Sequence, residues 1–377
     1  MAPVDAPAPA TSKPSTDDAP APATTVKEVK RPVWPNNNER PELRTLKGRF
    51  ARVAMIASLY FLWVVGLLIY SSLTVFSALS FVHAIVFFQP VHPVAVGFVL
   101  VMMAYYSYHL VLFPGQGPWM WMRHFIRDTL TKYPYFRYNK CVFEEFPDEE
   151  DDLKPLAKPD EKAMYAFHPH GILSCGWSFN GAHHMRFAEA KAKWLVAENL
   201  FWYPVMRDVL NWVEFGNVAK ETFVSLMSKG KNLCVIPGGF EEATIYQHGK
   251  HRLYLNCRFG FIKLALQYGY KIHPVYTFGE EMAYYAFPYF LKFRLWLNTL
   301  KIPGAVFMGN PFCSILPLPD VDLITVVGKP MQFPKIENPT KEDVKKYHAL
   351  YVKAVVDLFE RNKAKYAVDP NATLEIM

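Results

Sequence analysis

The hydrophobic pattern of the sequence is dominated by one long segment without charged side chains. From Val53 to Met122 the chain contains no Lys, Arg, Asp or Glu. About 20 consecutive apolar residues are enough to cross a bilayer, and soluble cores seldom lack charge over such a length. We therefore expect a transmembrane helical hairpin over residues 50–115 rather than a pair of buried core helices.

This segment has room for two spans. The first is expected over about 53–75 and the second over about 94–113, with a turn at Gln89–Pro93 between them. Residues 76–88 are apolar as well, so the pattern leaves the end of the first span open.

Cationic residues flank the hairpin on the sides that lead to the two termini. The turn has no Lys or Arg, whereas the flanks carry Lys47, Arg49 and Arg52 on one side and Arg123, Arg127 and Lys132 on the other. Because cytoplasmic loops carry the excess of positive charge, both termini are expected in the cytosol.

Beyond the hairpin, short apolar runs alternate with helical patterns. The runs predict strands at Ala163–Phe167, Asn232–Ile236, Ile272–Thr277, Val306–Met308 and Leu323–Val327. Helical stretches lie between them, at Tyr203–Val213, Thr222–Ser228 and Phe261–Tyr268. This alternation predicts an α/β fold for residues 161–366, which follow the hairpin as a cytosolic domain.

A long amphipathic helix is expected near the C-terminus. Its apolar face carries Val344, Tyr347, Tyr351, Val355, Leu358 and Phe359, and its polar face carries Lys345, Lys346, Lys353 and Asp357. We expect this helix to cover the sheet and to take no part in chemistry.

The remaining segments differ in composition. Residues 1–42 are rich in Pro and Ala and predict a disordered cytosolic tail. Residues 116–160 are expected to form an interfacial segment, with Trp119–Met122 at headgroup depth, followed by an acidic linker at Glu144–Asp152. Residues 367–377 are expected to form a C-terminal tail.

Charge and cysteine content narrow the classes of partner. A formal charge of +7 fits a protein that lies against anionic headgroups or binds phosphate-rich ligands, and it does not indicate nucleic acid. Five cysteines without Cys-x-x-Cys spacing favour a reduced compartment. The pairs His168 with His170 and His248 with His251 lack further ligands at metal spacing, so no metal site is expected.

The first candidate for chemistry is the cluster His168-Pro169-His170-Gly171. It follows a predicted strand, where α/β proteins place functional loops. Imidazole titrates near neutrality and is the commonest general base. Pro169 restrains the loop, and Gly171 permits close backbone approach. The cluster could therefore supply one base and one orienting group, and a structural turn is the alternative.

The second candidate lies in Val235–Glu242, again a strand followed by a tight turn. Gly238 and Gly239 expose backbone amides that can bind an oxyanion or phosphate, and Glu242 can orient a histidine. The basic residues that follow could contact coenzyme A phosphates: His248, Lys250, His251, Arg252, Arg258 and Lys263. A plain turn and a solvated face are the alternatives.

Other catalytic motifs are absent from the sequence. Ser174 stands at the wrong offset for a Gly-x-Ser-x-Gly nucleophile elbow, which disfavours a lipase of that type. There is also no glycine-rich dinucleotide fingerprint and no Walker loop.

Five sequence blocks follow one another between roughly Tyr165 and Lys365: His168–Gly171, Pro237–Glu242, Arg258–Ala265, Pro274–Glu280, and Thr325–Met331 with Pro339-Thr340 behind it. Taken together, these blocks resemble those of the type 2 diacylglycerol acyltransferase family, which also contains monoacylglycerol acyltransferases and some wax synthases.

The resemblance implies transfer of a fatty acyl group from acyl coenzyme A to diacylglycerol, which forms triacylglycerol. It also implies an endoplasmic reticulum membrane protein that reaches lipid droplets and needs no cofactor beyond its acyl coenzyme A co-substrate. The expected partners are acyl coenzyme A, diacylglycerol and the bilayer, and homo-oligomerisation stays open.

The resemblance and the residues together suggest roles at the site. We expect His170, or else His168, to be the base, with Glu242 orienting it. Substrate binding is expected to involve Pro169, Gly171, Gly238, Gly239, Arg258, Lys263 and Glu280. The alternatives are a monoacylglycerol or fatty-alcohol acyltransferase of the same family, a membrane-anchored lipid hydrolase, and a non-enzymatic hairpin protein.

Overall fold

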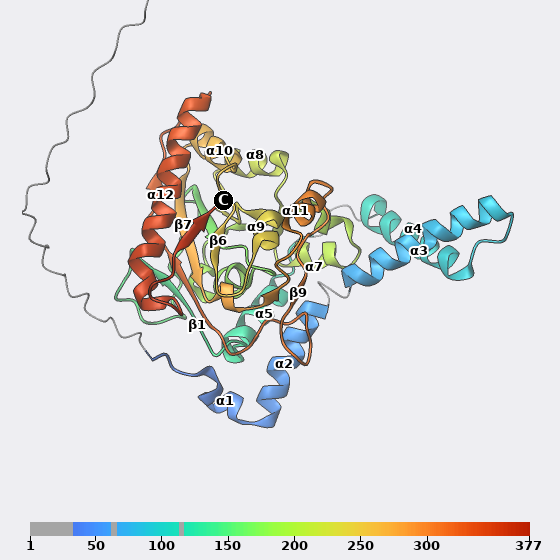
Figure 1. Ribbon diagram of the computed structural model, residues 1–377, viewed down its shortest axis with the longest axis horizontal. Coiled ribbons are helices and arrows are strands. Elements are labelled where there is room, and N and C mark those ends of the chain that lie inside the picture. The colour runs from blue at the N-terminus through green and yellow to red at the C-terminus, as the bar shows by residue number, and fades with distance from the viewer. Residues whose placement is uncertain (1–32, 62–65, 113–116) are drawn as a thin grey trace, which may run out of the picture. The chain divides into compact units, whose positions relative to one another are not determined.

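The computed structural model describes residues 33–61, 66–112 and 117–377, and a mixed eight-stranded sheet lies at the centre of that part of the chain (Figure 1). The strand order is β1-β10-β7-β2-β5-β3-β4, and β11 pairs with β7. The strands are β1 (Tyr138–Phe143), β2 (Ala163–His168), β3 (Lys193–Val196), β4 (Phe215–Asn217), β5 (Leu233–Val235), β7 (Lys271–Phe278), β10 (Asp322–Val327) and β11 (Met331–Gln332).

The strands β2, β3, β4, β5 and β7 run parallel, while β10 and β1 run in the opposite direction. Four of the five predicted strands correspond to β2, β5, β7 and β10, which confirms them. The fifth is β9 (Phe307–Met308), which pairs with β8 (Tyr285–Ala286) outside the main sheet. The short strands β3 and β4 were not predicted, because Lys193 begins one and Gly216 and Asn217 end the other, so neither forms an apolar run like that around β5.

Both faces of the sheet are buried, as the alternation of β2 shows. Ala163, Tyr165 and Phe167 belong to one apolar core, and Met164 and Ala166 belong to the other. The first core also receives side chains from α2 (Leu46–Tyr60), α5 (Met120–Lys132), α6 (Cys175–Trp177) and α7 (Met206–Trp212). The second receives them from α8 (Lys220–Ser228), α10 (Gly260–Tyr268) and α12 (Lys341–Tyr366). The predicted mixed α/β architecture is confirmed.

The terminal helix α12 follows the predicted apolar stripe. The side chains of Val344, Tyr351, Val355, Leu358 and Phe359 are buried against the sheet. A capping box between Thr340 and Asp343 satisfies the first backbone donors of the helix.

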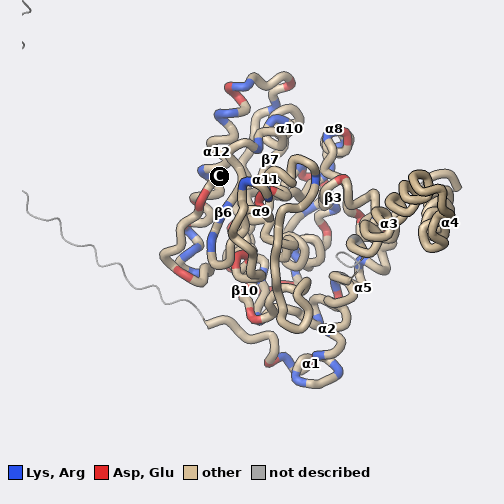
Figure 2. The backbone as a smooth tube through the Cα atoms, turned by 45° about the vertical axis from the view of Figure 1, so that its right-hand side comes forward, with Lys and Arg blue, Asp and Glu red and all other residues tan. Residues whose placement is uncertain are grey.

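In the described part of the chain, two helical segments are long and apolar enough to cross a membrane, Leu68–Phe87 and Pro93–Leu112. The first lies in α3 (Gly66–Phe87), and the second consists of α4 (Pro93–Ser107) with the helical residues Tyr108–Leu112 that follow it. Figure 2 shows both helices free of charged residues. The first candidate span lies later than the expected 53–75, because α2 ends at Tyr60 and its residues Ile56 and Tyr60 pack into the core of the domain.

The segment before α2 packs against the domain. The Trp34 ring stacks on Tyr138 at 5.2 Å and on Tyr366 at 5.9 Å between ring centroids. The amide of Asn37 donates to the carbonyl oxygen of Phe136 at 2.9 Å, and a short helix, α1 (Pro41–Arg44), follows. The disordered tail expected for residues 1–42 otherwise lies outside the described residues.

Two further segments join sheets where we expected a linker and a tail. The strand β1 lies within 116–160 and forms an edge of the main sheet. Near the C-terminus, β12 (Leu374–Ile376) pairs with β6 (His251–Leu253). Both strands are partly exposed and contain polar or charged residues, so neither has a continuous apolar run that would predict a strand.

The stacking of Trp34 predicts a stability effect outside the sheet. Replacing Trp34 by alanine removes two aromatic contacts and should lower the free energy of unfolding by about 2 kcal/mol. The matched control is Val33→Ala, because the Val33 side chain is 97% exposed. Thermal unfolding of the purified proteins measures both, and equal midpoints would contradict the packing of this segment.

Candidate active site

The end of β2 carries the first histidine of the cluster into the interior. His168 follows Met164 and Ala166 on the face of the sheet that α12 covers, and its side chain is fully buried. Its ring Nε2 lies 2.8 Å from the hydroxyl of Tyr351 on α12. Burial lowers the pKa of His168 to about 3, so the ring is neutral at physiological pH.

The second histidine lies beyond the strand and is only partly buried. The backbone N–H of His170 donates to Oε2 of Glu242 at 2.7 Å. In the ring, Nδ1 lies 3.0 Å from the carbonyl oxygen of Gly171, and the hydroxyl of Ser174 lies 3.3 Å from Nδ1 and 3.4 Å from Nε2. Burial lowers the pKa of His170 below its ordinary value of 6.5. The less buried imidazole of the pair is therefore neutral at physiological pH as well.

Glu242 connects the two predicted clusters. It lies in the first turn of α9 (Gly239–Ile245) and is 1% exposed. Besides the N–H of His170, its carboxylate accepts the N–H of Tyr254 at 3.0 Å. Oε1 also lies 4.0 Å from Nδ1 of His168, which is beyond hydrogen-bond distance. Burial raises the pKa of Glu242 to about 7.

Glycine is required at two points where backbone approaches a buried carboxylate. A Cβ atom at Gly238 would lie 2.3 Å from the carboxyl carbon of Glu242. Gly171 has a φ of +60°, and a Cβ there would lie 2.1 Å from Oε1 of Glu280. Any side chain at either position would displace a carboxylate from the site.

Glu280 accepts hydrogen bonds from the loop that follows His170. It is fully buried, and its two oxygens accept the backbone N–H groups of Cys175 at 3.0 Å and Gly176 at 2.6 Å. Burial raises its pKa to about 8. Both carboxylate oxygens thus accept hydrogen bonds from the start of α6, next to Gly171.

Of the two cationic residues expected to bind substrate, Arg258 borders the site and Lys263 does not contact the histidines. Arg258 donates from Nη2 to the carbonyl oxygen of Gly238 at 3.1 Å and pairs with Glu241, so it borders the Gly238-Gly239 turn. Lys263 is exposed on α10, and no contact joins its side chain to the histidines in the described part of the chain.

Two contacts at the site were not predicted from the sequence. Tyr351 was assigned to the apolar stripe of α12, which covers the sheet as expected, and its hydroxyl also reaches His168. Ser174 was considered only as a nucleophile, whereas its hydroxyl lies beside the ring of His170. A tyrosine in an apolar stripe carries no signal that its hydroxyl reaches a polar partner.

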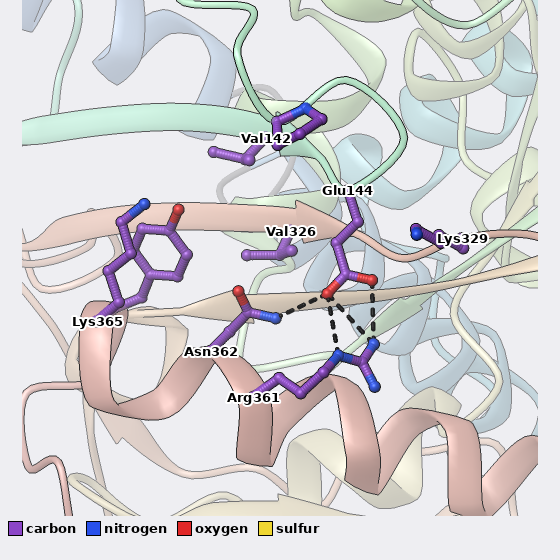
Figure 3. A pocket seen from close by; sticks show the side chains of 9 residues that line it. Val142, Glu144, Val326, Lys329, Arg361, Asn362 and Lys365 are labelled. Carbon is purple, nitrogen blue, oxygen red and sulfur yellow. Dashed lines mark hydrogen bonds and ion pairs between the residues drawn. The ribbon is translucent and has the colours of Figure 1, made fainter.

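A pocket elsewhere in the fold does not include these residues. It has a volume of about 490 Å³ and lies between α12 and the edge of the sheet formed by β1 and β10 (Figure 3). Arg361 and Asn362 both donate to Glu144 within it. Val326 of the pocket pairs with Tyr276 of β7, which pairs with His168 on its other side, so the pocket lies two strands away from the histidine.

Metal ligation finds no support in the described residues. No group of three or more His, Cys, Asp or Glu side chains is arranged there to bind an ion. The chemistry available at the site is that of a neutral imidazole beside buried carboxylates and backbone amides.

Comparison with known proteins identifies the family. Residues 135–377 match the diacylglycerol acyltransferase family. Diacylglycerol O-acyltransferase 2 of Dictyostelium discoideum is 33% identical over 235 residues, which cover 58% of this chain and 71% of that protein. Acyl-CoA wax alcohol acyltransferase 2 of Homo sapiens is 30% identical over 237 residues, with the same two coverages of 58% and 71%.

A solved structure with some likeness is the 1-acyl-sn-glycerophosphate acyltransferase PlsC from Thermotoga maritima, which is 15% identical, with a TM-score of 0.37 over 80% of this chain and 99% of that chain. The family match covers more than half of the sequence and contains both clusters of the site. The chain therefore belongs to the diacylglycerol acyltransferase family, and it is an acyltransferase.

Proposed function

We propose that this protein transfers a fatty acyl group from acyl coenzyme A to the free hydroxyl of diacylglycerol, with His170 as the general base. The observation that carries the proposal is the partly buried, neutral imidazole of His170, whose backbone is fixed by Glu242. Family membership supports the reaction class. The presence of a wax alcohol acyltransferase among the relatives keeps other acceptors open.

The hydrogen bonds of His170 favour one tautomer. The carbonyl oxygen of Gly171 can only accept, so Nδ1 at 3.0 Å from it carries the proton. This leaves Nε2 unprotonated and able to accept a proton from a substrate hydroxyl. A base positioned in this way contributes roughly 10² to 10⁴ in rate.

The reaction needs only one base, because a thioester is already an activated acyl donor. Nε2 of His170 takes the proton as the acceptor oxygen attacks the thioester carbonyl carbon. The carbon–sulfur bond of the tetrahedral intermediate then breaks, and the coenzyme A thiolate leaves with the proton from His170. Backbone amides at Gly171, or at Gly238 and Gly239, would stabilise the oxyanion.

The buried residues around His170 act as positioning residues. Glu242 fixes the backbone of His170, while Tyr351 fixes the ring of His168 at the end of the same loop. Pro169 lies between the two histidines in a cis peptide bond after His168. Glu280 fixes the loop from the side of Gly171.

We assign the two substrates to different parts of the protein. We assign the phosphates of acyl coenzyme A to the neighbourhood of Arg258 and Lys263, and diacylglycerol to the bilayer that α3 and α4 would span. The reaction as written uses no cofactor. We place the protein in the endoplasmic reticulum membrane with both termini in the cytosol.

The acceptor is tested directly with labelled acyl coenzyme A. Purified protein in vesicles is incubated with diacylglycerol, monoacylglycerol, a fatty alcohol, or no acceptor, and the lipid products are separated. Labelled triacylglycerol should exceed every other product. Free fatty acid that forms equally with and without acceptor would mean a hydrolase, and predominant wax ester would mean a fatty-alcohol acyltransferase.

Removal of the base predicts a large loss of turnover. His170→Ala should lower kcat by roughly 10² to 10⁴ while the protein is expressed normally. His124→Ala is the matched control, because His124 is exposed on α5 and lies outside the site. Near wild-type turnover in His170→Ala would contradict the assignment.

The pH profile separates the two titrating groups. The pKa of His170 is lowered, so its charge appears only as the pH falls below 6.5, and activity should be lost there. Glu242 has a pKa of about 7, so its protonation should cause an earlier, partial decline. Glu242→Gln should lower kcat by roughly 10²-fold and keep only the lower limb. An unchanged decline near pH 7 in this variant would contradict the role of Glu242.

Tyr351→Phe tests the support of His168. Loss of the hydroxyl leaves Nε2 of a buried imidazole without a partner, which should cost about 1–3 kcal/mol of stability. Because Tyr351 does not touch substrate, kcat should fall while KM stays unchanged. Tyr347→Phe on the same helix is the control and should change neither. A Tyr351→Phe protein as stable and active as this control would show that the contact is dispensable.

A further inference from the structure

The segment around α11 (Leu291–Thr299) exposes an unusual number of large apolar side chains. We define the insert surface as Tyr289, Phe290, Phe293, Trp296, Leu300 and Met308. Phe290 is 73% exposed and Trp296 is 53% exposed. These residues lie on α11, on the segments that flank it and, for Met308, on β9. Contiguous exposed apolar surface of this kind marks a site of contact with another molecule or a membrane.

On α11 polar side chains are buried and aromatic side chains are exposed, which is the reverse of a helix at the surface of a water-soluble protein. Its buried side chains are Arg294 and Asn298, while Phe293 and Trp296 point outward. Arg294 donates from Nε to the carbonyl oxygen of Gly304 at 2.7 Å, and Asn298 donates to the Thr244 hydroxyl at 2.8 Å. These bonds fix the rotation of the helix, so the aromatic side chains cannot turn inward.

One end of the insert surface lies close to the candidate membrane span of α4. The hydroxyl of Tyr106 on α4 donates to the carbonyl oxygen of Trp202 at 2.5 Å. The ammonium group of Lys301, just after α11, lies 5.7 Å from the centre of the Trp202 ring. One exposed tryptophan therefore contacts both the apolar helix and the end of the insert.

The charge of the segment matches a lipid surface. From Met282 to Pro319 the chain contains no Asp or Glu, whereas Lys292 and Lys301 are exposed beside the aromatic residues. Aromatic rings at headgroup depth with cations beyond them are typical of interfacial elements, and anionic lipids attract such cations.

We propose that the insert surface contacts the headgroup region of the bilayer, as a second membrane contact besides α3 and α4. Its position bears on the active site, because α11 lies beside α9 (Figure 1). Thr244, which accepts from Arg294 through its carbonyl oxygen and from Asn298 through its hydroxyl, is two residues from Glu242 on that helix. The contact would thus bring the helix that carries Glu242 to the membrane surface.

The test is photo-crosslinking of the full-length protein in vesicles. Benzoylphenylalanine is placed at position 293 or 296, and the vesicles contain phosphatidylcholine, phosphatidylserine and a trace of radiolabelled phosphatidylcholine. Leu350→benzoylphenylalanine is the matched control, because Leu350 is 45% exposed on another helix, α12. The readout is lipid adduct per protein chain and does not depend on enzymatic activity.

The proposal expects roughly tenfold more lipid adduct at positions 293 and 296 than at 350. Equal lipid adduct at all three positions would overturn it. An adduct of two protein chains at 293 or 296 in place of the lipid adduct would overturn it as well, because a second copy would then cover the insert surface.

Discussion

The buried carboxylate of Glu242 is the interaction on which the site depends. Its oxygens accept backbone N–H groups from His170, after β2, and from Tyr254, after β6. The carboxylate itself comes from the first turn of α9. Three segments, one of them 72 residues before Glu242, are therefore joined at one group, and Gly238 leaves the space that this group occupies. An isolated buried carboxylate would be costly, and the two backbone bonds offset that cost.

The sheet gives the two histidines different surroundings, although only one residue separates them. His168 is the last residue of β2, so the strand alternation directs it into the core with Met164 and Ala166. His170 lies past the strand and stays partly exposed. One imidazole is therefore suited to structural support and the other to contact with substrate, and the choice between them follows from the position at which the strand ends.

Much of this organisation could be predicted from residue patterns. The apolar runs predicted the central strands, the apolar stripe predicted α12, and two loops after predicted strands supplied His168, His170 and Glu242 as candidate site residues. Short strands such as β3 and β4 left no periodic signal. The first candidate span begins later than expected, because an apolar run does not show which of its residues pack in the domain core as part of α2. The contact of the Tyr351 hydroxyl could not be predicted, because an apolar stripe indicates only core packing.

The central claim is that His170 is neutral, with its proton on Nδ1 and its Nε2 free to act as a base. Nitrogen NMR of protein labelled with ¹⁵N-histidine, assigned by comparison with His170→Ala, measures both the charge and the tautomer of this ring. At pH 7 the account predicts a neutral ring with an unprotonated Nε2. An imidazolium at that pH, or a neutral ring with its proton on Nε2, would contradict it.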